Sequence, residues 1–147
     1  MTTNKSDAEL ADQLSRRRAR MLPVLGLFFI LQQSAFWSNP PAERAVDHVR
    51  IGAWVLLTGV ILFTLSTNGF WFRPVKVRAM IDDELTRANR TSAMHWGFVA
   101  AMIAGMLVYV VEGVTQFTAR EVIHLIVSAG IIVALVRFAL LERSGYA

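Results

Sequence analysis

The chain has 147 residues, of which 54% are hydrophobic, and its mean hydropathy is +0.45. This composition is too apolar for a soluble domain of that length and is typical of a small membrane protein with a single domain. Cysteine is absent, which excludes disulfides, iron–sulfur clusters, thiolate zinc sites and cysteine nucleophiles. The net charge is +4. The basic residues that produce it lie near the predicted membrane boundaries and do not form a helix-turn-helix pattern, so no nucleic-acid partner is expected.

Four long apolar segments, separated by short charged connectors, predict the architecture. Each is close to the roughly 20 residues that a helix needs to cross a hydrocarbon layer. The predicted spans are residues 21–37, 51–72, 94–114 and 122–141. We therefore expect an all-α polytopic membrane protein. A polar cytoplasmic segment over residues 1–20 precedes an antiparallel bundle of four transmembrane helices over residues 21–147.

Tryptophan and proline residues support these boundaries. Trp37, Trp54 and Trp96 all fall near predicted span ends, where aromatic side chains mark the headgroup level. Pro23 is placed near the start of the first helix, where its missing N–H costs little. The first helix is expected to stop at Ser38-Asn39-Pro40-Pro41.

The basic residues predict the orientation. With the N-terminus in the cytoplasm, 12 of the 15 Lys and Arg residues lie on the inner side, and only Arg44, Arg50 and Arg120 lie outside. This positive-inside bias predicts a multi-pass protein of the bacterial inner membrane with both termini in the cytoplasm. The first span is expected to be retained, because residues 35–38 lack the small-x-small pattern of a cleavage site.

Residues 75–93 contain no glycine or proline and are rich in helix formers. We expect them to form a cytoplasmic stalk that runs unbroken into the third span, giving a helix of about 40 residues and about 60 Å. The charged residues of the stalk form either a solvated helical face or a docking surface for a cytoplasmic protein partner. These residues are Asp82, Asp83, Glu84, Arg87 and Arg90.

The segment before the third span has a characteristic order of residues: Ile81-Asp82-Asp83-Glu84-Leu85-Thr86-Arg87-Ala88-Asn89-Arg90, followed by Gly97-Phe98-Val99-Ala100. It resembles a pattern in a family of uncharacterised small bacterial membrane proteins. In that family an acid–acid-x-Thr-Arg-Ala helix leads directly into a membrane span. The resemblance implies a four-helix inner-membrane protein, and it implies no activity.

Small residues recur at a spacing of four in the third and fourth spans. They are Ala93, Gly97, Ala101 and Gly105 in the third span, and Gly130 and Ala134 in the fourth. Such a stripe lets another helix approach closely in lipid, where van der Waals packing replaces the hydrophobic driving force. We expect the stripe to pack helices within one bundle, and a homodimer seam is the alternative.

Polar residues near the outer membrane level are candidate ligands. His48, Glu112 and His124 suit a divalent metal by residue type. Their spacing is not diagnostic, so no metal and no other cofactor is predicted. Glu112 falls on the small-residue face, near the outer end of the third span, and we expect it to lie at the membrane interface, hydrogen-bonded or paired with Arg120 or Arg50. The alternative is that Glu112 points into protein, where a carboxylate binds a proton or cation.

Arg137 lies near the inner end of the fourth span, on the face that carries Gly130 and Ala134. We expect its side chain to reach the inner headgroups. The alternatives are a fixed charge paired to an acid of the stalk, or an anion site.

No nucleophile–base arrangement and no soluble domain accompany the spans. We therefore expect a non-enzymatic integral membrane protein that serves as an accessory, scaffold or regulatory partner. The alternative is an oligomeric small transporter or channel, with Glu112 and Arg137 near a pathway between copies. An enzyme that uses Asp47, His48, Glu112 and His124 with a metal ranks third.

Overall fold

The computed structural model describes residues 7–38, 44–67 and 83–144. These residues form four helices: α1 (Asp7–Ser38), α2 (Arg44–Thr67), α4 (Glu84–Val111) and α5 (Ala119–Ser144). No strand occurs in the described part of the chain. The predicted all-α fold class is confirmed there.

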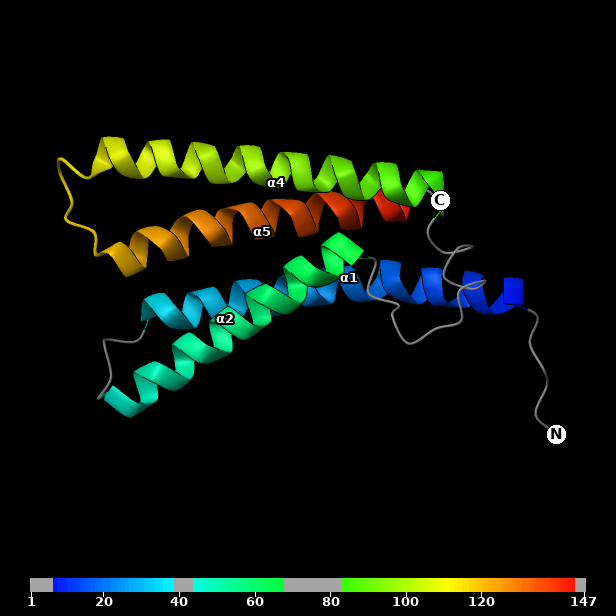
Figure 1. The fold of residues 1–147 in the computed structure, drawn as a ribbon, viewed down its shortest axis with the longest axis horizontal. Coiled ribbons are helices and arrows are strands. Elements are labelled where there is room, and N and C mark those ends of the chain that lie inside the picture. The colour runs from blue at the N-terminus through cyan, green and yellow to red at the C-terminus, as the bar shows by residue number, and fades with distance from the viewer. Residues whose placement is uncertain (1–6, 39–43, 68–82, 145–147) are drawn as a thin grey trace.

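The helices are arranged around α5, which lies between α4 and α1 (Figure 1). Consecutive helices run in opposite directions, so the starts of α1 and α4 lie at the same end as the last turn of α5. α2 is inclined to the other three helices and touches α4 and α5 over short stretches. The packing is therefore uneven, with α5 as the central helix.

Three of the described helices are long and apolar enough to cross a membrane. They are Val46–Thr67 of α2, Glu84–Val111 of α4 and Ala119–Ser144 of α5. In the most apolar stretch of α5, 44% of the residues are buried against protein, compared with 17% in α2 and 6% in α4. Most of the apolar surface of α4 consequently faces outward.

α1 is one continuous helix that joins the polar N-terminal segment to the first apolar segment. Arg16 and Asp12 form an exposed i,i+4 ion pair at 3.1 Å in its polar half. Pro23 lies inside this helix and not near its start, which corrects the sequence-based placement. The reason is that residues 7–20 are already helical, so the helix begins well before Pro23.

α4 begins at Glu84, later than the stalk prediction placed its start. Asp83 has an extended backbone (φ −68°, ψ 170°), and its carboxylate Oδ1 accepts a hydrogen bond from the Thr86 N–H at 2.8 Å. This is an N-cap, which starts a helix and is incompatible with an unbroken helix through Asp83. Residues 84–93 do continue into the apolar part of α4, whereas residues 68–82 lie outside the described residues.

The small-residue stripe lies at the α4–α5 interface. A Cβ built on Gly97 would lie 2.7 Å from the carbonyl oxygen of Gly130 and 2.8 Å from Cβ of Ala134. A Cβ on Gly130 would lie 3.0 Å from the Gly97 carbonyl oxygen and 3.1 Å from Cβ of Ala101. The two backbones touch here, and only glycine allows that distance. The seam continues at Ala93, which is fully buried.

The apolar core lies on the other side of α5. Phe29 of α1 and Ile61 of α2 are both 0% exposed, and Leu135 of α5 is 1% exposed. Leu22, Leu65 and Ile131 belong to the same cluster. Most of the cluster comes from α1, α2 and α5, and it extends to α4 through Ala93.

Replacing Gly97 by alanine is expected to destabilise the protein by about 1–3 kcal/mol, because the new Cβ would overlap the Gly130 carbonyl oxygen. Thermal unfolding of the purified protein in mild detergent, followed by circular dichroism, measures this loss. Gly59→Ala on α2 is the matched control, because a Cβ there meets nothing within 4 Å. A G97A protein as stable as the G59A protein would contradict the backbone contact.

Candidate functional site

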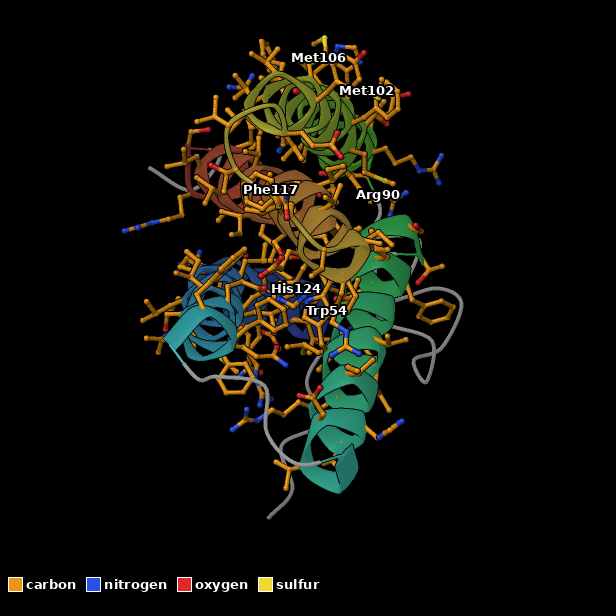
Figure 2. All side chains as sticks on the ribbon, turned by 90° about the vertical axis from the view of Figure 1, so that its left-hand side faces the viewer. Trp54, Arg90, Met102, Met106, Phe117 and His124 are labelled. Carbon is orange, nitrogen blue, oxygen red and sulfur yellow. The ribbon has the colours of Figure 1, made fainter. Side chains whose placement is uncertain are left out.

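An aromatic layer, defined as Phe36, Trp54 and His124, joins α1, α2 and α5. The His124 ring lies 3.8 Å from the Phe36 ring and 4.5 Å from the Trp54 ring, centre to centre, with interplanar angles of 15° and 27°. Two nearly parallel neighbours at these distances occupy opposite faces of the imidazole. His124 is 5% exposed, and Figure 2 shows it beside Trp54 between the helices.

The start of α5 fixes the direction in which His124 points. The backbone N–H and the hydroxyl of Thr118 both donate to Oε2 of Glu121, at 2.8 and 2.9 Å. The Glu121 N–H donates back to the Thr118 hydroxyl at 3.3 Å. This reciprocal pairing is a capping box, which sets where the helix begins. With the start fixed, His124 and Ser128 fall on the face toward α1 and α2.

A polar layer, defined as Gln33, Thr58 and Ser128, lies one helical turn from the aromatic layer. Ser128 follows His124 by one turn on α5, Thr58 follows Trp54 on α2, and Gln33 precedes Phe36 on α1. Because α1 runs opposite to α2 and α5, all three steps lead in the same direction. Each residue of this layer is 7% exposed.

One hydrogen bond is made across the polar layer. The Ser128 hydroxyl donates to Oε1 of Gln33 at 2.9 Å, and both side chains are buried. Four other buried atoms of the two layers have no hydrogen-bond partner in the described part of the chain: Nε2 of Gln33, Nε1 of Trp54, Oγ1 of Thr58 and Nε2 of His124. Buried polar atoms are rarely left unpaired in folded proteins, so this concentration distinguishes the junction from the rest of the core.

Asp47 and Arg120 connect α2 to α5 beside the aromatic layer. Nη1 of Arg120 donates to Oδ2 of Asp47 at 2.8 Å. The expected pairing of Glu112 with Arg120 is therefore wrong, because the Arg120 guanidinium binds Asp47. Arg120 lies in the first turn of α5, and the ion pair directs its side chain toward α2 instead of toward the end of α4.

The three metal candidates lie in different surroundings. His124 is enclosed by Phe36 and Trp54, whereas His48 and Glu112 are exposed. Among residues 7–38, 44–67 and 83–144, no group of three or more His, Cys, Asp or Glu side chains is placed to hold a metal ion.

Glu112 and Arg137 do not share a site. α4 ends at Val111, so Glu112 is the exposed C-cap at the start of the connecting turn. This exposure contradicts the alternative in which Glu112 points into protein. Arg137 is also exposed, and its guanidinium carbon lies 6.0 Å from the centre of the Trp96 ring. Trp96 and Glu112 are about 24 Å apart along α4.

The charged set before the third span is only partly described. Asp82 lies outside the described residues, and the Asp83 carboxylate is engaged as the N-cap of α4. Glu84 and Arg87 are exposed, and Arg90 is half-buried. Exposed charges thus remain at the start of α4, on Glu84 and Arg87.

Several residues in the interior were not singled out from the sequence. Trp54 was interpreted as an interfacial anchor, and Phe36, Thr58 and Ser128 gave no signal of their own. Glu142 is 4% exposed in the last turns of α5, one turn after the buried Phe138 and two turns after Leu135. The spacing from Leu135 and Phe138 places Glu142 on the buried face of α5. This spacing could have predicted from the sequence that Glu142 is buried.

Gln33→Leu and Ser128→Ala are each expected to destabilise the α1–α5 contact, and the double variant should lose less than their sum. The expected coupling is about 1 kcal/mol, the range found for hydrogen bonds between membrane helices. Reversible unfolding in detergent measures the cycle. Ser34→Ala is the control, because its hydroxyl bonds only to the Leu31 carbonyl of its own helix. Equal coupling of Ser34 and Gln33 to Ser128 would refute the contact.

No protein-family model, curated protein or solved structure matches the chain. Functional assignment consequently rests on the geometry and chemistry of its own residues.

Proposed function

We propose that the chain is a non-enzymatic, four-span protein of the bacterial inner membrane, with both termini in the cytoplasm, that acts as an accessory, scaffold or regulatory partner of another membrane protein. α4 provides the binding surface in this proposal. One face of α4 packs on α5, and the opposite face is available to a partner helix.

The observation that carries this proposal is the exposure of α4. Only 6% of its most apolar stretch is buried against the rest of the chain. Phe98, Met102, Met106 and Tyr109 are all exposed, and their spacing puts them on one face of the helix. Methionine-rich apolar faces adapt readily to partner surfaces. Arg87 and Glu84 add exposed charges at the start of the same helix.

A fourth span over α1 is consistent with its surface. Val24, Leu27, Phe28 and Leu31 are each between 57% and 58% exposed, at the i, i+3, i+4, i+7 spacing of one helical face. An outward apolar face of this kind is suited to lipid. The arginines in the polar half of α1, and Arg143 in the last turn of α5, support cytoplasmic termini through the positive-inside rule.

Single-cysteine labelling tests the orientation directly, because the chain has no cysteine of its own. Arg87→Cys should be protected from a membrane-impermeant thiol reagent in intact cells. Gln116→Cys, in the turn between α4 and α5, should react. Both positions are exposed, so the difference reports the side of the membrane. Labelling of Arg87→Cys from outside would overturn the proposed orientation.

Photocrosslinking in native membranes tests the partner role. A photoreactive amino acid at Phe98 of α4 should capture the same protein as one at Arg87. The control position is Leu56 of α2, which is 69% exposed and apolar, and should give lipid adducts only. Identical capture from Phe98 and Leu56, or no protein from either α4 position, would count against α4 as the binding surface.

A further inference from the structure

We propose that the junction between the polar layer and the aromatic layer is a binding site for an uncharged, hydrogen-bond-accepting oxygen. Water or the carbonyl group of a lipid-soluble molecule supplies such an oxygen. This site is distinct from the α4 surface, because it is formed by α1, α2 and α5.

Thr58 provides the first indication. Two other threonines of α2 satisfy their hydroxyls within the helix: Thr64 donates to the Val60 carbonyl and Thr67 to the Phe63 carbonyl, each at 2.7 Å. The same back-bond is open to any threonine in a helix. The Thr58 hydroxyl is buried and has no partner in the described part of the chain, so this threonine, unlike the other two, does not make the back-bond.

The remaining unpaired atoms define which chemistry fits. Oε1 of Gln33 already accepts from Ser128, which leaves only the donor end of that amide. The indole Nε1 of Trp54 is a donor and never an acceptor. The Thr58 hydroxyl and Nε2 of His124 serve in either role. An acceptor is compatible with each of these four atoms, and a single neutral oxygen accepts from two of them through its two lone pairs, whereas a pure donor fits only Thr58 and His124.

Charge excludes a bound anion. Neither layer contains a Lys or Arg residue. Arg120, one turn before His124 on α5, is held by Asp47 at 2.8 Å. An anion buried without a nearby cation carries a large desolvation cost. The occupant is therefore a neutral oxygen.

The enclosure of the residues supports a built site rather than a surface feature. Gln33, Thr58 and His124 come from three different helices, and each is more than nine-tenths buried. Phe36 and Trp54 cover the two faces of the imidazole, so only its edge is left for bonding.

Thr58→Val tests whether the hydroxyl is engaged. Valine has the same shape without the hydroxyl, so an unengaged Thr58 would be replaced at no cost or with a gain. We expect instead a fall in melting temperature of about 3 °C. Thr64→Val is the matched control on the same helix, and it should lower the melting temperature less, because it removes only a bond to its own helix.

Fluorescence of Trp54 separates the two sources of oxygen. Trp37→Phe, Trp71→Phe and Trp96→Phe leave Trp54 as the only tryptophan. A short-chain benzoquinone, added to this protein in detergent, serves as the carbonyl probe. Saturable quenching that is lost in Gln33→Leu assigns the site to a carbonyl ligand, and a protein that retains only Trp96 controls for partitioning of the probe.

Destabilisation by Thr58→Val without saturable quenching assigns the site to bound water. A Thr58→Val protein at least as stable as the parent, together with unsaturable quenching of Trp54, overturns the proposal. The fluorescence arm does not depend on the stability of the Thr58 variant, so a poorly folding variant leaves the ligand test intact.

Discussion

The close approach of Gly97 and Gly130 is the contact on which the position of α4 depends. Within the hydrocarbon region, apolar side chains gain little by leaving lipid for protein, so helices associate through dense packing and through polar groups. A carbonyl oxygen that would meet a Cβ at 2.7 Å leaves no room for any side chain. The buried face of α4 also carries Thr86, Asn89 and Ala93, whereas most of its apolar stretch is turned outward. A small change at these two positions therefore acts on the whole helix.

α5 uses different physical interactions on its two sides. Toward α4 it presents Gly130 and Ala134, where the two backbones meet at small residues. Toward α1 and α2 it presents His124 and Ser128, followed by the apolar Ile131 and Leu135. Polar groups in this second interface restrict the register of the helices, because Ser128 finds its partner only when Gln33 is level with it. Packing thus sets the distance on one side, and hydrogen bonding sets the register on the other.

Much of the helical architecture could be predicted from the sequence, because hydropathy and helix-forming composition are local properties. The glycine and alanine spacing also indicated the face that lies between α4 and α5. The start of α4 was missed, since an aspartate within a helix-rich segment gives no local sign that it will act as a cap. Whether Asp83 caps or continues the helix depends on the backbone that precedes it.

The interior of the site was not predictable in the same way. A tryptophan near a predicted span end suits the headgroup level, and Trp54 lies near such an end. Its ring nevertheless stacks on His124, which belongs to a helix distant in sequence. Similarly, Arg120 forms its ion pair with Asp47 and not with Glu112, which is nearer in sequence. Such pairings depend on how α2 is inclined to α5, which no periodicity encodes. The sequence singled out His124 as a polar residue near the outer membrane level, but not the rings that surround it.

The continuity of α1 links the position of its polar half to that of its apolar half. Its polar half and its apolar half are a single helix, so the orientation of one half is transmitted to the other. Pro23 is the position where bending costs least, because it has no N–H for the carbonyl four residues earlier. A bend of about 20° there would displace Asp7, about 24 Å along the axis, by about 8 Å. The angle at Pro23 therefore sets where the polar half of α1 lies relative to the helices that pack on its apolar half.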